Sequence, residues 1–93
     1  MELEEMQKEI IANRVRRGFP SATDLSKTTK GLEEEISEWK EALSNNNREL
    51  QIDALCDIMV FCLGGLKILG VSATEELTKV IENNKIRTHS HVH

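Results

Sequence analysis

The chain has 93 residues, enough for one small domain with a single hydrophobic core. Its 12 Lys and Arg against 16 Asp and Glu leave a formal net charge of −4, which argues against general nucleic-acid binding because neutralising phosphates requires a basic surface. One proline, five glycines and three aromatic residues leave little material for turn-rich sheets, so we expect an all-α fold.

The first helix is predicted over residues 3–15, with Leu3, Met6 and Ile10 on one side. The segment 18–20 ends it, because its glycine offers a left-handed cap and its proline cannot continue the helix.

The second helix is predicted from near Ser21, in a variant of the capping-box pattern, to Ser44. Three asparagines at 45–47 then predict a turn. Apolar residues recur along this helix at helical spacing. They are Leu25, Leu32, Ile36, Trp39 and Leu43.

The third helix is predicted over 48–69 and stops at Gly70, and a capping box at 72–75 opens the fourth. From Ala54 to Leu69 the third helix is apolar nearly all round, so we expect it to be surrounded on most sides. Three short neighbours do not suffice for that. We therefore predict a four-helix bundle over residues 1–88, completed by a homodimer or dimer of dimers, and a flexible tail at 89–93.

The longest strongly apolar stretch, 58–69, is too short and too polar to cross a bilayer, so no membrane partner is expected. The acidic N-terminus is neither a signal nor a transit peptide. Cys56 and Cys62 lie on different helix faces and cannot pair with each other. We interpret them as buried small side chains in a reducing cytoplasm.

Acidic residues crowd the second helix. Glu35 and Glu38 lie on one flank of the apolar stripe, beside small residues, whereas Glu34 and Glu41 point away from the core. A solvated face is the ordinary explanation of an acidic run, so this helix alone does not establish a site.

The third helix adds Asp57, whose apolar sequence neighbours predict at least partial burial. A buried carboxylate without a partner costs several kcal/mol. Asp53 lies one turn earlier on the same face, and no Lys or Arg lies within one turn of Asp57. Oxygen ligands from two facing helices suit Mg²⁺ or Mn²⁺. The alternative is an arginine from the first or fourth helix.

Several residues outside the acidic run allow two interpretations of their role. Asn84 falls where the apolar stripe of the fourth helix should continue, so either its amide meets a polar group inside or the helix end frays. Lys30, Lys85 and Arg87 could neutralise phosphate or be ordinary solvated charges.

The segment 31–38, followed by 53–58, resembles MazG-like nucleotide pyrophosphohydrolases of the all-α NTP pyrophosphatase superfamily. Residues 6–19 resemble the first helix of that family and its end, and 82–87 resemble its closing segment. The resemblance covers residues 3–87.

The resemblance implies that Glu35 and Glu38 are Mg²⁺ ligands and that Asp57 is the aspartate ligand. The chain departs from the family at Ala54, where a glutamate is expected. Asp53 stands beside it and is a plausible substitute ligand.

The implied activity is hydrolysis of a nucleoside triphosphate between the α and β phosphates, releasing a monophosphate and pyrophosphate. Glu34 or Glu38 would orient or deprotonate the attacking water. Trp39 is either a stacking platform for the base or, more simply, a core residue. The expected substrate-binding residues are Asn84, Lys85, Arg87, Lys30 and Trp39.

Two other functions compete with this one. Phosphoribosyl-ATP is the alternative substrate, since relatives of that kind also carry the D-A-L-x-D arrangement found at 53–57. A non-catalytic helical dimerisation or regulatory module is the second. A di-iron carboxylate bundle is excluded because it needs Glu-x-x-His pairs, and the only histidines lie at 89, 91 and 93.

Overall fold

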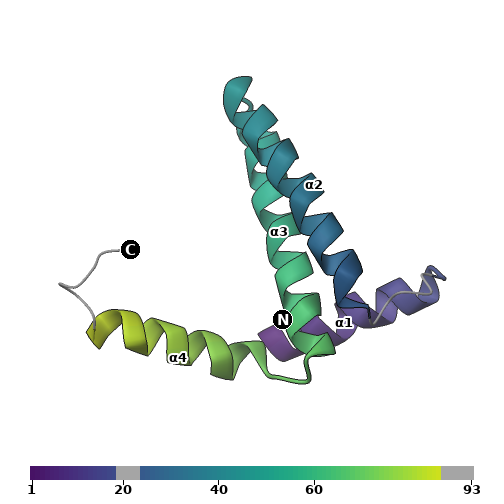
Figure 1. Ribbon diagram of the computed structural model, residues 1–93, viewed down its shortest axis with the longest axis vertical. Helices are drawn as coiled ribbons and strands as arrows, with labels where there is room; N and C mark the ends of the chain where they lie inside the picture. The colour runs from purple at the N-terminus through teal and green to yellow at the C-terminus, as the bar shows by residue number, and fades with distance from the viewer. Residues whose placement is uncertain (19–23, 87–93) are drawn as a thin grey trace.

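The computed structural model describes residues 1–18 and 24–86, which form four α-helices (Figure 1). The all-α fold of four helices predicted from the sequence is confirmed. α2 and α3 run side by side as a long hairpin, α1 crosses its base, and α4 leads away from it (Figure 1). The helices are α1 (Leu3–Arg16), α2 (Leu25–Ser44), α3 (Arg48–Ile68) and α4 (Ala73–Ile86).

The predicted helix ends are confirmed where glycine or asparagine supplies them. Gly18 and Gly70 have φ angles of 77° and 80°, in the left-handed region that favours glycine after a helix. In the turn between α2 and α3, Asn46 has φ 51°, and the Asn47 side chain accepts a hydrogen bond from the Leu50 N–H.

The start of α2 differs from the prediction. Asp24 has extended backbone and caps the helix, because its carboxylate accepts hydrogen bonds from both the N–H and the hydroxyl of Ser26. α2 therefore begins at Leu25 rather than near Ser21. Ser21 itself lies outside the described residues, as does the predicted tail.

The start of α4 is joined to α1 through a serine. The Ser72 hydroxyl accepts from the Glu75 N–H, which is one arm of the predicted capping box, and donates to the Glu4 carboxylate at 2.7 Å. That hydrogen bond is the largest reason why the pKa of Glu4 falls to about 2.

A buried glutamine connects three helices. Gln7 on α1 is 2% exposed, and its amide nitrogen donates to the carbonyl oxygens of Leu63 (3.2 Å) and Val71 (3.3 Å). Its amide oxygen accepts from the N–H of Ala73 at 3.1 Å. The side chain thus binds the end of α3 and the beginning of α4 to α1.

Small residues allow α2 and α3 to approach each other closely. A Cβ at Gly31 would overlap the ring of Phe61 on α3, and one at Gly65 would contact Thr28 of α2. The buried apolar residues among those described are three alanines and one leucine. They are Ala42, Ala54, Leu63 and Ala73.

In the single chain α3 is not surrounded on most sides, in keeping with the expectation that its three neighbours do not suffice. Leu55 and Met59 are 46% and 58% exposed, and the thiols of Cys56 and Cys62 are free and exposed rather than buried. The physical reason is that only α1 and α2 pack along α3, while α4 turns away from it (Figure 1). The radius of gyration, 15.2 Å, exceeds the roughly 12 Å of a compact chain of this length.

No individual helix among the described residues has both the length and the hydropathy needed to span a membrane. α3 and α4 together meet the length and composition criteria, but they meet at an angle of 109°.

Candidate active site

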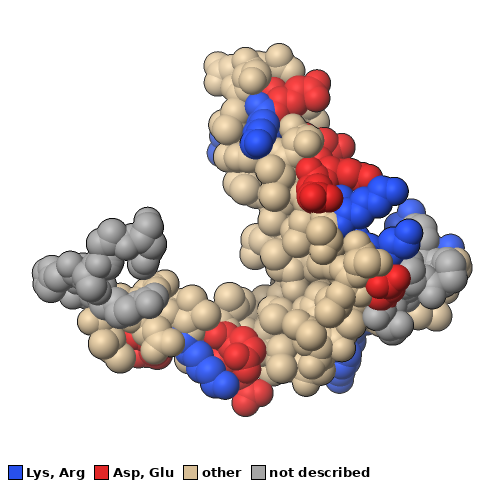
Figure 2. Space-filling model, in the orientation of Figure 1, with Lys and Arg blue, Asp and Glu red and all other residues tan. Residues whose placement is uncertain are grey.

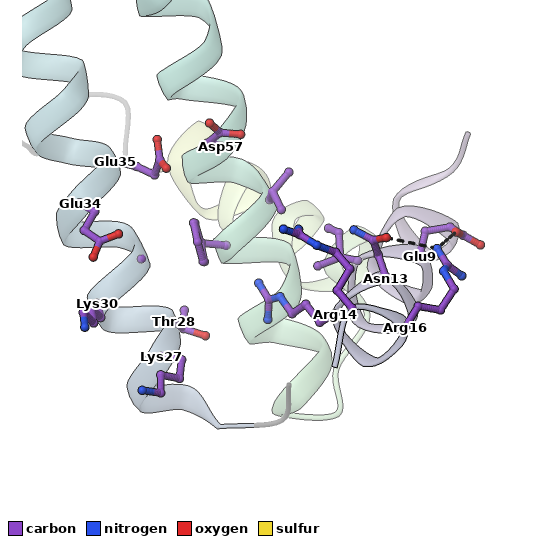
Figure 3. A pocket seen from close by; sticks show the side chains of 15 residues that line it. Glu9, Asn13, Arg14, Arg16, Lys27, Thr28, Lys30, Glu34, Glu35 and Asp57 are labelled. Atoms are coloured by element: carbon purple, nitrogen blue, oxygen red, sulfur yellow. Dashed lines mark hydrogen bonds and ion pairs between the residues drawn. The ribbon is translucent and has the colours of Figure 1, made fainter. Parts of the chain in front are cut away.

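A cavity of about 1040 Å³ lies where α1 crosses the α2–α3 hairpin, and all three helices contribute to its lining (Figure 3). Charged side chains of both signs face it. We call its five cations the basic wall and distinguish them from its four carboxylates. The basic wall is Arg14, Arg16, Arg17, Lys27 and Lys30, and the carboxylates are Glu9, Glu34, Glu35 and Asp57.

Charges of both signs are distributed along the cavity, and Glu9 pairs with Arg16 on α1. Glu35 of α2 and Asp57 of α3 lie across from each other at one end, whereas Lys27 lies at the other end of the same stretch of α2 (Figure 3). Figure 2 shows acidic side chains on the outer edge of the hairpin, followed by basic ones toward the end where α1 crosses. A polyanion can therefore place its phosphates on basic groups while one end approaches the carboxylates.

A smaller hollow of about 350 Å³ continues the acidic end of the cavity along the hairpin. Asp57 lines both spaces, and Glu38 and Asp53 line the smaller one. The structure thus brings the four predicted metal ligands to one region, which we call the carboxylate cluster: Glu35, Glu38, Asp53 and Asp57.

Glu35 is the most strongly perturbed member of the carboxylate cluster. The neighbouring Glu38 carboxyl group, then burial, then the negative charge of Asp57 raise the pKa of Glu35 to about 7. Its Oε1 atom is buried and has no hydrogen-bond partner within the described residues. Such crowding of carboxylates is relieved by a cation or a proton.

The donor set fits a hard divalent cation, because it consists of carboxylate oxygens and includes one buried oxygen without a partner. Among residues 1–18 and 24–86, however, no three acidic, histidine or cysteine side chains converge closely enough to hold an ion. The carboxylates are neighbours, but their oxygen atoms do not converge on one metal position.

Asp57 is exposed, so the prediction of its burial is wrong for the single chain. Its face of α3 opens onto both hollows instead of packing against apolar side chains. Asp53 also faces the smaller hollow, while neighbouring Ala54 is 3% exposed between the two helices. Asp53 therefore faces the same hollow as Glu38 and Asp57.

The predicted substrate-binding residues are only partly brought together. Lys30 and the candidate base Glu34 line the main cavity. Trp39 is half-buried and lines neither space, in keeping with a packing role. Asn84 and Lys85 are exposed on the distal part of α4, away from the hairpin (Figure 1), and Lys85 pairs with Glu82 at 3.3 Å.

Asn84 thus meets no polar interior in this chain. Arg87 lies outside the described residues.

Sequence reasoning did not assign several residues of the cavity wall to a site, among them Arg14 and Phe61. The guanidinium of Arg14 lies 5.5 Å from the centre of the Phe61 ring, and both side chains line the cavity. Only a glycine opposite each of them hinted at this arrangement. A Cβ at Gly64 would meet the Arg14 guanidinium, and one at Gly31 would overlap the Phe61 ring.

Acidic side chains from both helices of the hairpin thus lie beside a cavity that carries charges of both signs. The family model for phosphoribosyl-ATP pyrophosphohydrolase matches residues 2–84. The chain belongs to this family, a member of the all-α NTP pyrophosphohydrolase superfamily. The resemblance to the superfamily is confirmed, but the family is not MazG itself. Comparison with curated proteins and with solved structures finds no match.

Family membership makes the protein a pyrophosphohydrolase, a hydrolase that acts on acid anhydrides.

Proposed function

We propose that this pyrophosphohydrolase requires Mg²⁺ or Mn²⁺ and cleaves the α–β phosphate bond of a nucleotide, releasing pyrophosphate. The first candidate substrate is phosphoribosyl-ATP, which the family supports better than an ordinary nucleoside triphosphate. The observation that carries the proposal is the carboxylate cluster, with its unpartnered Glu35 oxygen, at one end of a cavity whose other side is basic.

Different residues would bind the metal and activate the attacking water. Glu35, Glu38 and Asp57 would hold the metal, with Asp53 in place of the glutamate missing at Ala54. When bound, the metal neutralises phosphate oxygens and makes the phosphorus more electrophilic. A carboxylate that keeps a free oxygen accepts the proton of the attacking water. Glu34, which lines the main cavity, and Glu38 are the two candidates for that base.

Pyrophosphate release from phosphoribosyl-ATP and from a panel of nucleoside triphosphates, each with Mg²⁺, tests this function. We expect release from phosphoribosyl-ATP and none after chelation of the metal. Release from ordinary triphosphates alone would replace the proposed substrate with the one first predicted from the sequence. Silence on every nucleotide, with no effect of Mg²⁺ on the melting temperature, would favour a non-catalytic module.

We further propose that the working form is a homodimer. Large apolar side chains on α3 and α4 face solvent in the single chain. Burying an exposed apolar surface contributes about 25 cal/mol per Å². We take a second copy of this chain as the partner, because it is present wherever the chain itself is present. The exposed side chains include Leu55, Met59, Leu77, Val80 and Ile81.

Light scattering tests the dimer. We expect twice the chain mass of 10.6 kDa. Val80→Glu should shift the protein toward monomer, because a charge on the apolar face of α4 cannot be desolvated without a partner. Thr78→Glu, at another exposed position of α4, should leave the mass unchanged. A monodisperse monomer of the unaltered protein at high concentration would contradict the proposal.

A further inference from the structure

One cation of the basic wall, Arg14 of α1, lies against α3 beside a ring that packs against α2. A Cβ at position 64 would lie 2.8 Å from Nη2 of Arg14, so Gly64 leaves the space that the guanidinium occupies against α3. The Phe61 ring lies on another side of it, at 5.5 Å. Gly31 of α2 in turn leaves the space for that ring. The position of the guanidinium is therefore fixed by packing against Gly64 and Phe61.

No ion pair to the guanidinium of Arg14 is found among residues 1–18 and 24–86. Its Nη2 is buried and has no hydrogen-bond partner among the described residues, and burial lowers the pKa of this group. An arginine nonetheless keeps its proton in proteins. Arg16 on the same helix differs, because it contacts the Asn13 amide oxygen at 3.4 Å and the Glu9 carboxylate at 3.8 Å.

A partly buried charge without a partner lowers folding stability. Arg14 lines the same cavity as Glu35 and Asp57, yet no ion pair joins it to either carboxylate within the described residues. Its counter-charge is therefore expected to come from an anion that enters the cavity. The planar fork of a guanidinium matches the oxygens of a phosphate group.

We propose that Arg14 binds the terminal phosphates of the substrate, the part released as pyrophosphate. Lys27 and Lys30 line the same space and add positive charge there. This inference rests on the proposed function and deepens it: the leaving group lies toward Arg14, and the bond to be cleaved lies toward the carboxylate cluster. The ligand class is an inorganic or organic polyphosphate.

The test measures binding of inorganic pyrophosphate with Mg²⁺ by calorimetry, and melting temperature without ligand. Arg14→Met keeps the apolar stem and should weaken pyrophosphate binding roughly tenfold or more. Arg14→Lys keeps the charge but loses the planar fork of the guanidinium, so its affinity for pyrophosphate should lie between those of the unaltered protein and Arg14→Met. Arg48→Met is the matched control, since Arg48 is exposed at the start of α3, lines neither space, and its loss changes the net charge equally.

The melting temperature separates a ligand-binding arginine from a structural one. Arg14→Met should raise it, because an uncompensated charge leaves the interior, while Arg48→Met should not. A lower melting temperature with unchanged pyrophosphate affinity would make Arg14 structural and overturn the inference. Absence of pyrophosphate binding by the unaltered protein would overturn it as well.

Failure of this inference is distinguishable from failure of the proposed function. Hydrolysis of phosphoribosyl-ATP with an unchanged KM in Arg14→Met would leave the function standing and remove the role of Arg14. Arg14-dependent pyrophosphate binding without hydrolysis of any nucleotide would support the site and contradict the function.

Discussion

Replacing Glu35 with glutamine is expected to reduce pyrophosphate release by at least about a hundredfold and to abolish any rise in melting temperature caused by Mg²⁺. Glu35 has a buried oxygen without a hydrogen-bond partner among the described residues. The Glu38 and Asp57 carboxyl groups both raise its pKa. Glutamine keeps the shape of the side chain but removes its negative charge. The measurements are initial rates at saturating Mg²⁺ and thermal unfolding with and without the metal.

The same substitution should stabilise the metal-free protein slightly, because it relieves repulsion among neighbouring carboxylates. Glu33→Gln is the matched control: Glu33 lies on the same helix, is exposed, and lines neither space. It should change neither the rate nor the response to Mg²⁺. Unimpaired release by Glu35→Gln would remove this residue from the metal site.

Replacing Gln7 with leucine is expected to lower the free energy of unfolding by about 3 kcal/mol. The substitution removes three hydrogen bonds, to Leu63, Val71 and Ala73, and leaves the buried N–H of Ala73 without its partner. Each neutral bond contributes about 1 kcal/mol, and an unsatisfied buried group adds its own cost. Urea denaturation followed by circular dichroism gives the value.

Two further variants serve as controls for the loss of stability in Gln7→Leu. Lys8→Leu places the same side chain at the next, exposed position of α1 and should change stability by less than about 0.5 kcal/mol. Gln7→Glu keeps an acceptor for the Ala73 N–H but loses both donors, so it should also destabilise the protein. A change below about 1 kcal/mol in Gln7→Leu would show that water replaces the lost bonds.

The parts of the fold that sequence reasoning predicted are those that depend on local chemistry. Gly18 and Gly70 end helices because each adopts a left-handed conformation that costs other residues energy. Helical periodicity also placed Glu35 and Glu38 on one flank of α2. The opposing aspartates followed from a single short turn between two long helices.

The parts that were missed depend on contacts between distant segments. Nothing next to Gln7 or Arg14 in the sequence shows that one bridges three helices and the other reaches α3. The burial of Asp57 was inferred from its sequence neighbours, but burial depends on what packs against that face. The direction of α4, which separates Asn84 from the hairpin, depends on how the chain leaves Gly70 (Figure 1).

The glutamine connection also constrains the order in which the chain can fold during synthesis. The partners of Gln7 lie 56 to 66 positions later in the sequence, so α1 leaves the ribosome long before its bonds can form. The α2–α3 hairpin, whose helices are joined by a three-residue turn, can form from local contacts in the meantime. α1 must therefore wait until residues 63–73 have been synthesised before it can dock and complete the third wall of the cavity.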